Sequence, residues 1–270
     1  MPMLTPQKIA IDCIFHSPCI ELNYYDQGAG EPLIFIHGLG GSATNWRFQM
    51  EELSPHCRTI AMDLRSHGQS GYRPEKSITI RTFADDIIAL MTKLGLEQAH
   101  FCGLSMGGMI ALELYLRYPG QVKSLILADT TAFFPDSQRL GEFLQLLDSM
   151  SMRDWAQLFS FLILRREAPA ALRQELIDIT AATRRGPYRQ GLIATFSSDY
   201  RWLLPLIDVR TLILVGAEDQ ATPIGLAKYL QAQIPNAVLH LIPQSAHCTN
   251  LENPTEFNRH LLAHLDNWVK

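Results

Sequence analysis

Cysteine and long apolar runs are both scarce in this chain. Its 270 residues include five cysteines, an odd number without a Cys-x-x-Cys pair, so the sequence predicts neither a disulfide framework nor a zinc site. No stretch reaches the roughly 18 apolar residues that span a bilayer, and the N-terminal stretch has no unbroken apolar segment of the kind found in secretion signals. We therefore expect a protein of the reducing cytoplasm that does not act at a membrane.

An excess of positive charge is also missing. The 23 Lys and Arg residues face 27 Asp and Glu residues, a net charge of -4 at pH 7, which provides no attraction for a polyphosphate. Nucleic-acid binding is therefore not expected. The apolar fraction of 47% suffices for a full core, and the length predicts one large domain or a core with a smaller insertion.

Hydrophobic periodicity predicts strands that alternate with helices. Residues 9–15 and 20–25 alternate apolar with polar side chains, which indicates an antiparallel hairpin. Six later runs are short and mainly apolar, as in strands buried on both faces; they cover residues 33–36, 59–62, 99–102, 124–127, 211–215 and 237–242. The pattern predicts a mostly parallel sheet with helices on both faces and its chemistry at the carboxyl ends of the strands.

Four helices are indicated by spacing and by capping signals. Apolar residues three or four apart over 80–94 stop before Gly95, and residues 106–118 are apolar nearly all round, which predicts a buried helix. Two further helices are predicted where an N-cap residue precedes a proline, at Thr222-Pro223 and at Asn253-Pro254, the latter with Glu256 completing a capping box.

One segment interrupts the alternation. Residues 131–205 contain no clear strand and are rich in Phe, Leu, Met and Arg. We interpret them as a helical cap over the sheet, which divides the chain into a core of residues 1–130 and 206–270 and a cap of residues 131–205.

The motif Gly103-Leu-Ser105-Met-Gly107 follows one predicted strand and opens a helix, which is the context of a nucleophile elbow. The turn holds its serine against the neighbouring strand and helix, so the positions two before and two after must lack bulk. Glycine fills both positions. An ordinary glycine-rich turn is the alternative for an isolated motif, and partner residues elsewhere decide between the two.

A nucleophilic serine needs a base, and the base needs a carboxylate to orient it. In the α/β-hydrolase order the acid and then the histidine follow the serine, each on a loop after a strand. Asp219 follows the strand at 211–215, and His247 follows the last strand. Asp129, at the end of the strand at 124–127, is the rival for the acid, and Asp219 is favoured.

An oxyanion needs two preorganised N–H donors. The amide of Met106, directly after the serine, is one candidate, and that of Leu39 in His37-Gly38-Leu39-Gly40-Gly41 is the other. His37 is interpreted as a residue that organises this loop.

The same loop also fits a dinucleotide fingerprint. Gly38-x-Gly40-x-x-Ala43 follows a strand, and Asp63 lies twenty residues beyond Ala43. A dehydrogenase would leave the elbow, Asp219 and His247 without a role, so this interpretation is disfavoured. Asp63 and His67 are expected to bond to the backbone of a turn instead.

Taken together, the motifs resemble those of the α/β-hydrolase superfamily, and they span nearly the whole chain. They are His37-Gly38, Asp63-x-Arg65-x-His67-Gly68-x-Ser70, Gly103-x-Ser105-x-Gly107-Gly108, Gly216-x-x-Asp219 and Ala246-His247. The resemblance implies the α/β-hydrolase fold, with an eight-stranded mostly parallel sheet, a helical cap, and no metal or organic cofactor. Asp219-x-x-Thr222-Pro223 and Ala246-His247-x-x-Asn250-x-Glu252-x-Pro254 resemble the branch of 3-oxoadipate enol-lactonases and small carboxylesterases.

The predicted function is cleavage of a small carboxylic ester or lactone through an acyl-enzyme on Ser105. Relatives with aspartate at the elbow, the haloalkane dehalogenases and epoxide hydrolases, are excluded. Two alternatives stay open because they keep the triad: a carbon–carbon bond hydrolase and a ligand receptor of the same fold. The expected partner is a small-molecule substrate, and the chain is expected to be a monomer or a homodimer.

Substrate choice is expected to depend on the cap. Its aromatic residues Phe133, Phe134, Trp155 and Phe159 are candidates for an apolar pocket, with packing of the cap as the competing role. The cap also has nine Arg and no Lys, so one Arg is a candidate for gripping a substrate carboxylate. Four are singled out: Arg184, Arg185, Arg189 and Arg201.

Overall fold

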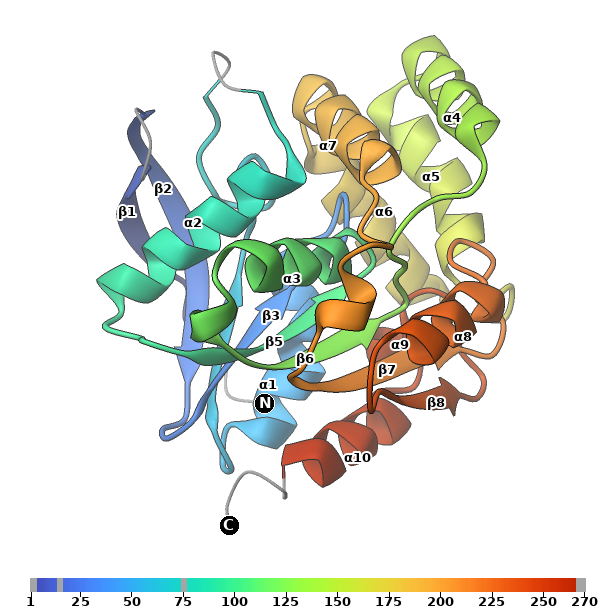
Figure 1. Cartoon of the computed structure of the whole chain (residues 1–270). Coiled ribbons are helices and arrows are strands. Elements are labelled where there is room, and N and C mark those ends of the chain that lie inside the picture. The colour runs from blue at the N-terminus through green and yellow to red at the C-terminus, as the bar shows by residue number, and fades with distance from the viewer. Residues whose placement is uncertain (1–3, 14–16, 74–76, 266–270) are drawn as a thin grey trace.

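The computed structural model describes residues 4–13, 17–73 and 77–265 (Figure 1). Its centre is an eight-stranded sheet in the order β1-β2-β4-β3-β5-β6-β7-β8. β1 and β2 form an antiparallel pair, β2 pairs antiparallel with β4, and every other pair is parallel. The predicted mostly parallel sheet and hairpin are therefore confirmed, although residues 14–16, part of the predicted hairpin, lie outside the described residues.

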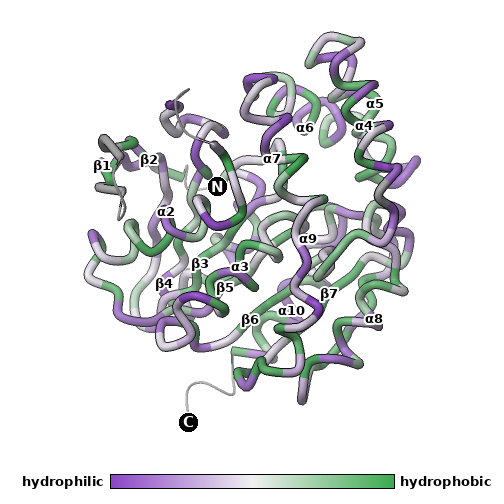
Figure 2. Tube along the Cα trace, turned by 45° about the horizontal axis from the view of Figure 1, so that its top comes forward, coloured by the Kyte–Doolittle hydropathy of each residue, from purple (hydrophilic) through white to green (hydrophobic). Residues whose placement is uncertain are grey.

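Most strands extend one or more residues beyond the predicted runs, whereas the last begins one residue later than predicted, at Val238. They are β1 Gln7–Cys13, β2 Ser17–Gln27, β3 Pro32–Ile36, β4 Arg58–Met62, β5 Ala99–Leu104, β6 Val122–Ala128, β7 Arg210–Gly216 and β8 Val238–Ile242. The central strands β3 to β7 are buried over most of their length, as continuous apolar sequence predicts for strands covered on both faces. The trace in Figure 2 is mostly hydrophobic along β3, β5 and β6.

Helices cover both faces of the sheet (Figure 1). One face packs against α2 Ile80–Lys93, α3 Met106–Arg117 and α8 Ile224–Gln233, whose buried residues form one apolar core with the sheet. The other face packs against η1 Ala43–Trp46, α1 Arg47–Leu53 and α10 Pro254–Leu265, which contribute to a second core. Two layers of helix on one sheet thus hold the strand ends in fixed positions.

Local chemistry sets the ends of the helices. α2 begins where the Thr79 side chain accepts a hydrogen bond from the amide of Thr82, and it ends before Gly95, whose φ of 70° is typical of a helix C′ residue. α3 is buried on nearly all sides as predicted, and its one acid, Glu113, accepts a hydrogen bond from the Tyr200 hydroxyl.

Two predicted caps differ in detail. α8 begins at Ile224 with Pro223 as N-cap, because the Thr222 hydroxyl binds the Asp219 carboxylate. Asn253 ends the short helix α9 Thr249–Glu252. Its side chain also accepts a hydrogen bond from the amide of Glu256, in the first turn of α10. The Glu256 carboxylate binds Arg259 rather than completing a capping box.

Four helices lie between β6 and β7 in the chain and stand above the sheet in Figure 1. They are the α-helices α4 Ser137–Ser149, α5 Met152–Ile163, α6 Ala170–Ala182 and α7 Arg185–Ser197. The one-turn helix η3 Leu204–Leu206 follows α7 before β7, and a second one-turn helix, η2 Pro119–Gln121, precedes β6. Leu147, Trp155, Tyr188 and Leu192 form an apolar cluster of their own within the four helices. This segment therefore has an apolar core of its own.

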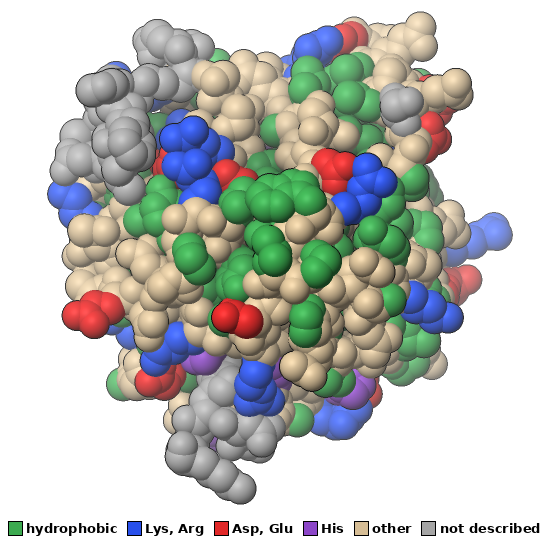
Figure 3. Space-filling model, in the orientation of Figure 1, with side chains coloured by type: hydrophobic (Ala, Val, Ile, Leu, Met, Phe, Trp, Pro, Cys, Tyr) green, Lys and Arg blue, Asp and Glu red, His purple; other side chains and the backbone are tan. Residues whose placement is uncertain are grey.

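The face of the molecule drawn in Figure 3 shows no dominant charge. Basic and acidic side chains are interspersed on the face drawn in Figure 3. No helix in the described part of the chain has the length and apolar character needed to span a membrane.

Candidate active site

Ser105 occupies a sharp turn between β5 and α3. Its φ of 56° lies in the left-handed region, and its amide donates to the carbonyl of Ala128 on the neighbouring strand. A Cβ on Gly103 would lie 2.2 Å from the Gly107 carbonyl oxygen, and one on Gly107 would lie 2.2 Å from the Ile36 carbonyl oxygen. The glycines thus have the steric role that the elbow motif predicts, and the strained serine projects from the carboxyl end of the sheet.

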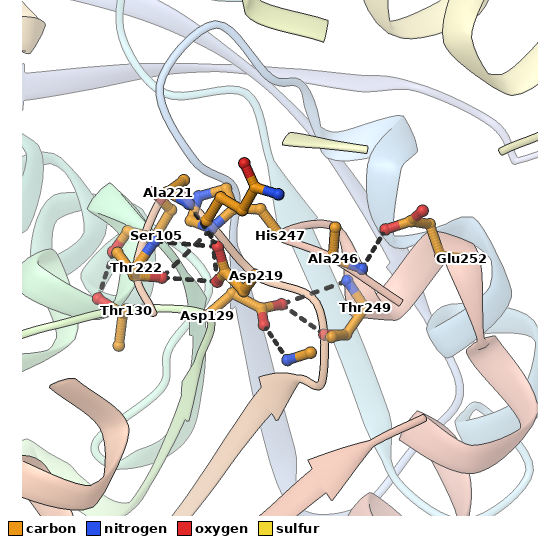
Figure 4. Close-up of polar contacts among 12 residues, drawn as sticks. Ser105, Asp129, Thr130, Asp219, Ala221, Thr222, Ala246, His247, Thr249 and Glu252 are labelled. Atoms are coloured by element: carbon orange, nitrogen blue, oxygen red, sulfur yellow. Dashed lines mark hydrogen bonds and ion pairs between the residues drawn. The ribbon is translucent and has the colours of Figure 1, made fainter. Parts of the chain in front are cut away.

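His247 and Asp219 contact each other on neighbouring loops (Figure 4). Nδ1 of His247 lies 2.9 Å from Oδ2 of Asp219, on the loop after β7. The other carboxylate oxygen accepts from the amides of Ala221 and Thr222 at 2.8 and 2.9 Å, and the Thr222 hydroxyl donates to Oδ2 at 2.7 Å. An ionised carboxylate only accepts, so Nδ1 carries the hydrogen and Nε2 is left as the basic nitrogen of neutral His247.

The charges of this pair reinforce each other. Burial raises the pKa of Asp219, but the charge of His247 and hydrogen bonds from His247 and Thr222 outweigh it and leave the pKa below its usual value. Burial lowers the pKa of His247, but Asp219, with a smaller contribution from Asp129, raises it above its ordinary value. The pair therefore favours an ionised acid beside an imidazole that readily takes a proton.

Asp129 lies in the same region and has a different set of partners. Its Oδ1 accepts from the amide of Gly216 at 2.9 Å, and its Oδ2 accepts from the Thr249 amide at 3.2 Å and the Thr249 hydroxyl at 2.5 Å. Burial, together with the charge of Asp219, raises its pKa well above the usual value. Asp219 rather than Asp129 is therefore the acid in hydrogen-bond contact with His247.

Two backbone amides near Ser105 have no acceptor in the part of the chain that the structure describes. The amide of Met106 is at the first position of α3, where an intrahelical partner is not available. The amide of Leu39 belongs to the turn closed by the hydrogen bond from Gly41 N to Gly38 O, with Gly40 at a φ of 73°. Both amides are therefore without a protein acceptor in the described residues, and Leu39 lines the same cavities as Ser105.

The remaining motif residues hold the loops. His37 receives a hydrogen bond from the Leu64 amide at Nε2, and its Nδ1 lies 2.7 Å from the Gly38 carbonyl. Burial lowers the pKa of His37 to about 4. The Asp63 carboxylate accepts from Asn23 and from the amides of Ala43 and Gln69, and His67 Nδ1 lies 3.0 Å from the Arg65 carbonyl. Asp63 is therefore buried and already accepts three hydrogen bonds within the protein, so its carboxylate is not presented to the ribose of a dinucleotide.

Two cavities meet at Ser105. The first, of about 510 Å³ including its open mouth, lies between the Gly38–Gly41 loop and helices α5 and α6; its walls include Leu104, Ile163, Leu176, Thr180, Cys248 and Leu251. The second, of about 410 Å³ including its open mouth, lies towards α4 and α7; its walls include Phe134, Arg139, Phe143, Leu162, Leu192, Thr195, Phe196, Ala221 and Thr222. Leu39, Ser105, Phe159 and His247 line both. A substrate centred on Ser105 can therefore extend in two directions.

The cavity walls include one thiol, that of Cys248. Burial, with the charges of nearby carboxylates, raises its pKa well above the usual value, so the thiol is protonated at neutral pH. Among the described residues no group of three His, Cys, Asp or Glu side chains is placed to hold a metal ion.

The predicted substrate residues divide into two groups. Phe134 lines the second cavity, and Phe159 lines both. Phe133 instead packs edge-on against Tyr229, and Trp155 is buried among Phe143, Phe159 and Tyr188, so neither lines these cavities. Both rings therefore pack against other aromatic side chains and lie outside the two cavity walls.

None of the four singled-out arginines lines either cavity. Arg184 lies over the Tyr72 ring, Arg185 donates to the carbonyls of Leu147 and Met150, and Arg189 and Arg201 pair with Asp148 and Asp199. The arginine on a cavity wall is Arg139, which the sequence analysis did not single out. Its place in the first turn of α4 gives no signal that distinguishes it from the other eight arginines of the segment.

Comparison with known proteins places the chain in a family. Residues 31–254 match the alpha/beta hydrolase fold family, so the chain belongs to it. Among curated proteins, 2-hydroxymuconate semialdehyde hydrolase of Pseudomonas sp. strain CF600 is 31% identical, over 88% of either chain. The 3-oxoadipate enol-lactonase 2 of Acinetobacter baylyi is 27% identical, over 88% of this chain and 91% of its own. A malate-bound thermophilic esterase from Thermogutta terrifontis superposes with a TM-score of 0.89 at 25% identity, over 97% of this chain and 98% of that chain.

Proposed function

We propose that this protein is a serine hydrolase that cleaves a small carboxylic ester or lactone through an acyl-enzyme. One observation carries the proposal. Ser105, His247 and Leu39 line the wall shared by the two cavities, and Asp219 binds Nδ1 of His247. Similarity to an enol-lactonase and to an esterase gives independent support.

In this proposal the Ser105 Oγ attacks the carbonyl carbon, and Nε2 of His247 takes the hydroxyl proton. The carbonyl oxygen becomes an oxyanion that accepts from the amides of Leu39 and Met106. The C–O bond to the alcohol then breaks, and His247 returns the proton to the leaving oxygen. Water attacks the acyl-enzyme in the same way, and Ser105 recovers its proton as the carboxylic acid leaves. Asp219 orients His247 and stabilises its imidazolium form.

We further propose that residues 131–205 act as a cap domain on a core of residues 1–130 and 206–270. Both cavities have one wall in helices α4–α7 and another in loops of the sheet. The cap is also bonded to the site directly, since the Thr180 hydroxyl donates to the Gly40 carbonyl and the His247 amide donates to the Ile163 carbonyl. Substrate shape is thus selected by the cap, while the core supplies the reacting groups.

Carbon–carbon bond hydrolysis is the second candidate. It is favoured by the 31% identity to 2-hydroxymuconate semialdehyde hydrolase. The two candidates use the same three side chains and differ in the bond that is broken, so the site geometry supports both.

Steady-state hydrolysis of a graded set of p-nitrophenyl esters and lactones tests the proposal. The wild type is compared with Ser105→Ala and, as a matched control, with Ser149→Ala, whose side chain is exposed and lines neither cavity. The expected result is turnover that disappears in Ser105→Ala and persists in Ser149→Ala. Turnover of a vinylogous diketone acid without turnover of any ester or lactone would transfer the assignment to the second candidate. Ester turnover retained in full by Ser105→Ala would overturn both.

A further inference from the structure

We propose that Arg139 binds an anionic group of the substrate, so that the preferred ester or lactone carries a carboxylate remote from the bond that is cleaved. This inference rests on the proposed function, since it concerns the substrate of the same serine. It names Arg139 as a specificity-determining residue of the second cavity.

The first argument is the charge of the cavity. The second cavity is lined by aromatic and aliphatic side chains with two threonines, and no acidic side chain of the described residues lines it. Arg139 is its one permanent cation in that part of the chain. An arginine keeps its charge at all physiological pH values, and a positive charge beside apolar walls favours an anionic ligand more strongly than the same charge in open water.

The second argument is the absence of a protein counterion. Four arginines of the same cap segment, Arg153, Arg165, Arg189 and Arg201, each pair with a carboxylate. Within the described residues, the Arg139 guanidinium pairs with no carboxylate. Glu142, one turn further along α4, forms no ion pair with it, and two other nearby carboxylates are engaged elsewhere. Asp136 accepts from the backbone amides at the start of α4, and Asp219 is engaged by His247, Ala221 and Thr222.

The third argument is that the guanidinium is held in place without using all its donors. Its two terminal nitrogens donate to the carbonyls of Ala221 and Gln220 at 3.2 and 3.4 Å, and its carbon lies 5.3 Å from the centre of the Phe143 ring. A guanidinium has five N–H donors in a planar fork. A preorganised fork with spare donors suits the two oxygens of a carboxylate.

The position relative to Ser105 indicates where the anion lies in the substrate. Ser105 and His247 line the same cavity as Arg139. The loop after β7, whose carbonyls accept hydrogen bonds from Arg139, also carries Asp219. A carboxylate at Arg139 therefore places the uncharged stem of the ligand along Phe134, Phe143 and Phe196, with its carbonyl at Ser105. The first cavity receives the other half of the substrate.

Matched substrates that differ only in charge test this inference. On the acyl side, mono-p-nitrophenyl adipate is compared with its methyl ester; on the alcohol side, 4-carboxyphenyl butyrate is compared with its methyl ester. kcat/KM is measured for the wild type, Arg139→Gln and Arg139→Lys, with Arg189→Gln as a control of equal charge change outside the cavities.

The expected result is a wild-type preference for the anionic member of one pair. Arg139→Gln should lose about 10- to 100-fold in kcat/KM on that anionic ester, the range of a charged hydrogen bond, and keep its rate on the neutral partner within about threefold. Arg139→Lys should retain part of the preference because it keeps the charge without the fork. Arg189→Gln should behave as the wild type.

Three outcomes would overturn this inference alone. The first is a preference for the neutral ester in both pairs, and the second is an anionic preference that survives Arg139→Gln. The third is an equal fall in kcat/KM of Arg139→Gln on charged and neutral esters, which would show that Arg139 merely ties α4 to the loop after β7. Absence of serine-dependent turnover on every ester would instead overturn the proposed function. The two failures are therefore distinguishable.

Discussion

The Asp219 carboxylate lies 2.9 Å from Nδ1 of His247, while Asp129, the other acid of this region, binds Gly216 and Thr249 instead. Asp219→Asn should therefore lower kcat by about 10⁴-fold, as expected when the histidine loses the acceptor that fixes its tautomer. Asp129→Asn should leave kcat within about tenfold. It should lower the free energy of unfolding by about 1–3 kcal/mol, because the carboxylate oxygens of Asp129 that accept these hydrogen bonds are buried. Ester kinetics and urea unfolding of both variants check this, and the reverse pattern would assign the acid to Asp129.

The charge of Asp219 also predicts a shift in pH dependence. The carboxylate helps to raise the pKa of His247 above 6.5, and the proposed mechanism requires neutral His247. Wild-type kcat/KM should therefore fall as the pH drops through a value above 6.5. In Asp219→Asn the imidazolium loses its stabilising charge, so the acid limb of the residual activity should move to lower pH. An acid limb at the same pH in both proteins would show that another group controls it.

The hydrogen bond from the Thr180 hydroxyl to the Gly40 carbonyl, 3.1 Å long, ties helix α6 to the turn that carries the Leu39 amide. Thr180→Val keeps the side-chain shape and removes the donor, so kcat should fall by about tenfold through misplacement of the oxyanion donor. Thr180→Ser keeps the donor and should restore most of kcat. A change confined to KM, or an equal loss in both variants, would argue against a positioning role for this hydrogen bond.

Backbone contacts at the elbow predict a stability difference between two glycines. A Cβ on Gly107 would lie 2.2 Å from the Ile36 carbonyl oxygen, whereas one on Gly141 in α4 meets nothing within 4 Å. Gly107→Ala should therefore lower the free energy of unfolding by about 1–3 kcal/mol or more, and Gly141→Ala should raise it by up to about 1 kcal/mol. Thermal and urea unfolding give both values, and a Gly107→Ala variant as stable as the wild type would contradict the geometry of this turn.

The framework of the site could be predicted from sequence because its causes are local. The glycines around Ser105 are required by contacts within one strand-turn-helix unit, and Asp219 and His247 follow strands whose carboxyl ends meet at one edge. Thr222, expected as a helix cap, binds Asp219 because the loop after β7 closes on its own carboxylate.

The residues that line the cavities could not be predicted in the same way. Phe133, Phe134, Trp155 and Phe159 are chemically alike, and only the packing of α4–α7 determines that Phe134 and Phe159 face a cavity. The same holds for Arg139 among nine arginines. Which of these side chains faces a cavity depends on contacts between helices that are distant in sequence. The sequence has no periodic signal for such contacts.

The central claim is that Ser105 is an activated nucleophile. Its most direct test is reaction of the wild type, Ser105→Ala and His247→Ala with a fluorophosphonate, followed by intact-mass and peptide-mass measurement. We predict a single adduct on Ser105 in the wild type, none in Ser105→Ala, and labelling slowed by at least about 100-fold in His247→Ala. An unlabelled wild type that still hydrolyses esters, or an adduct on another residue such as Cys248, would contradict the claim.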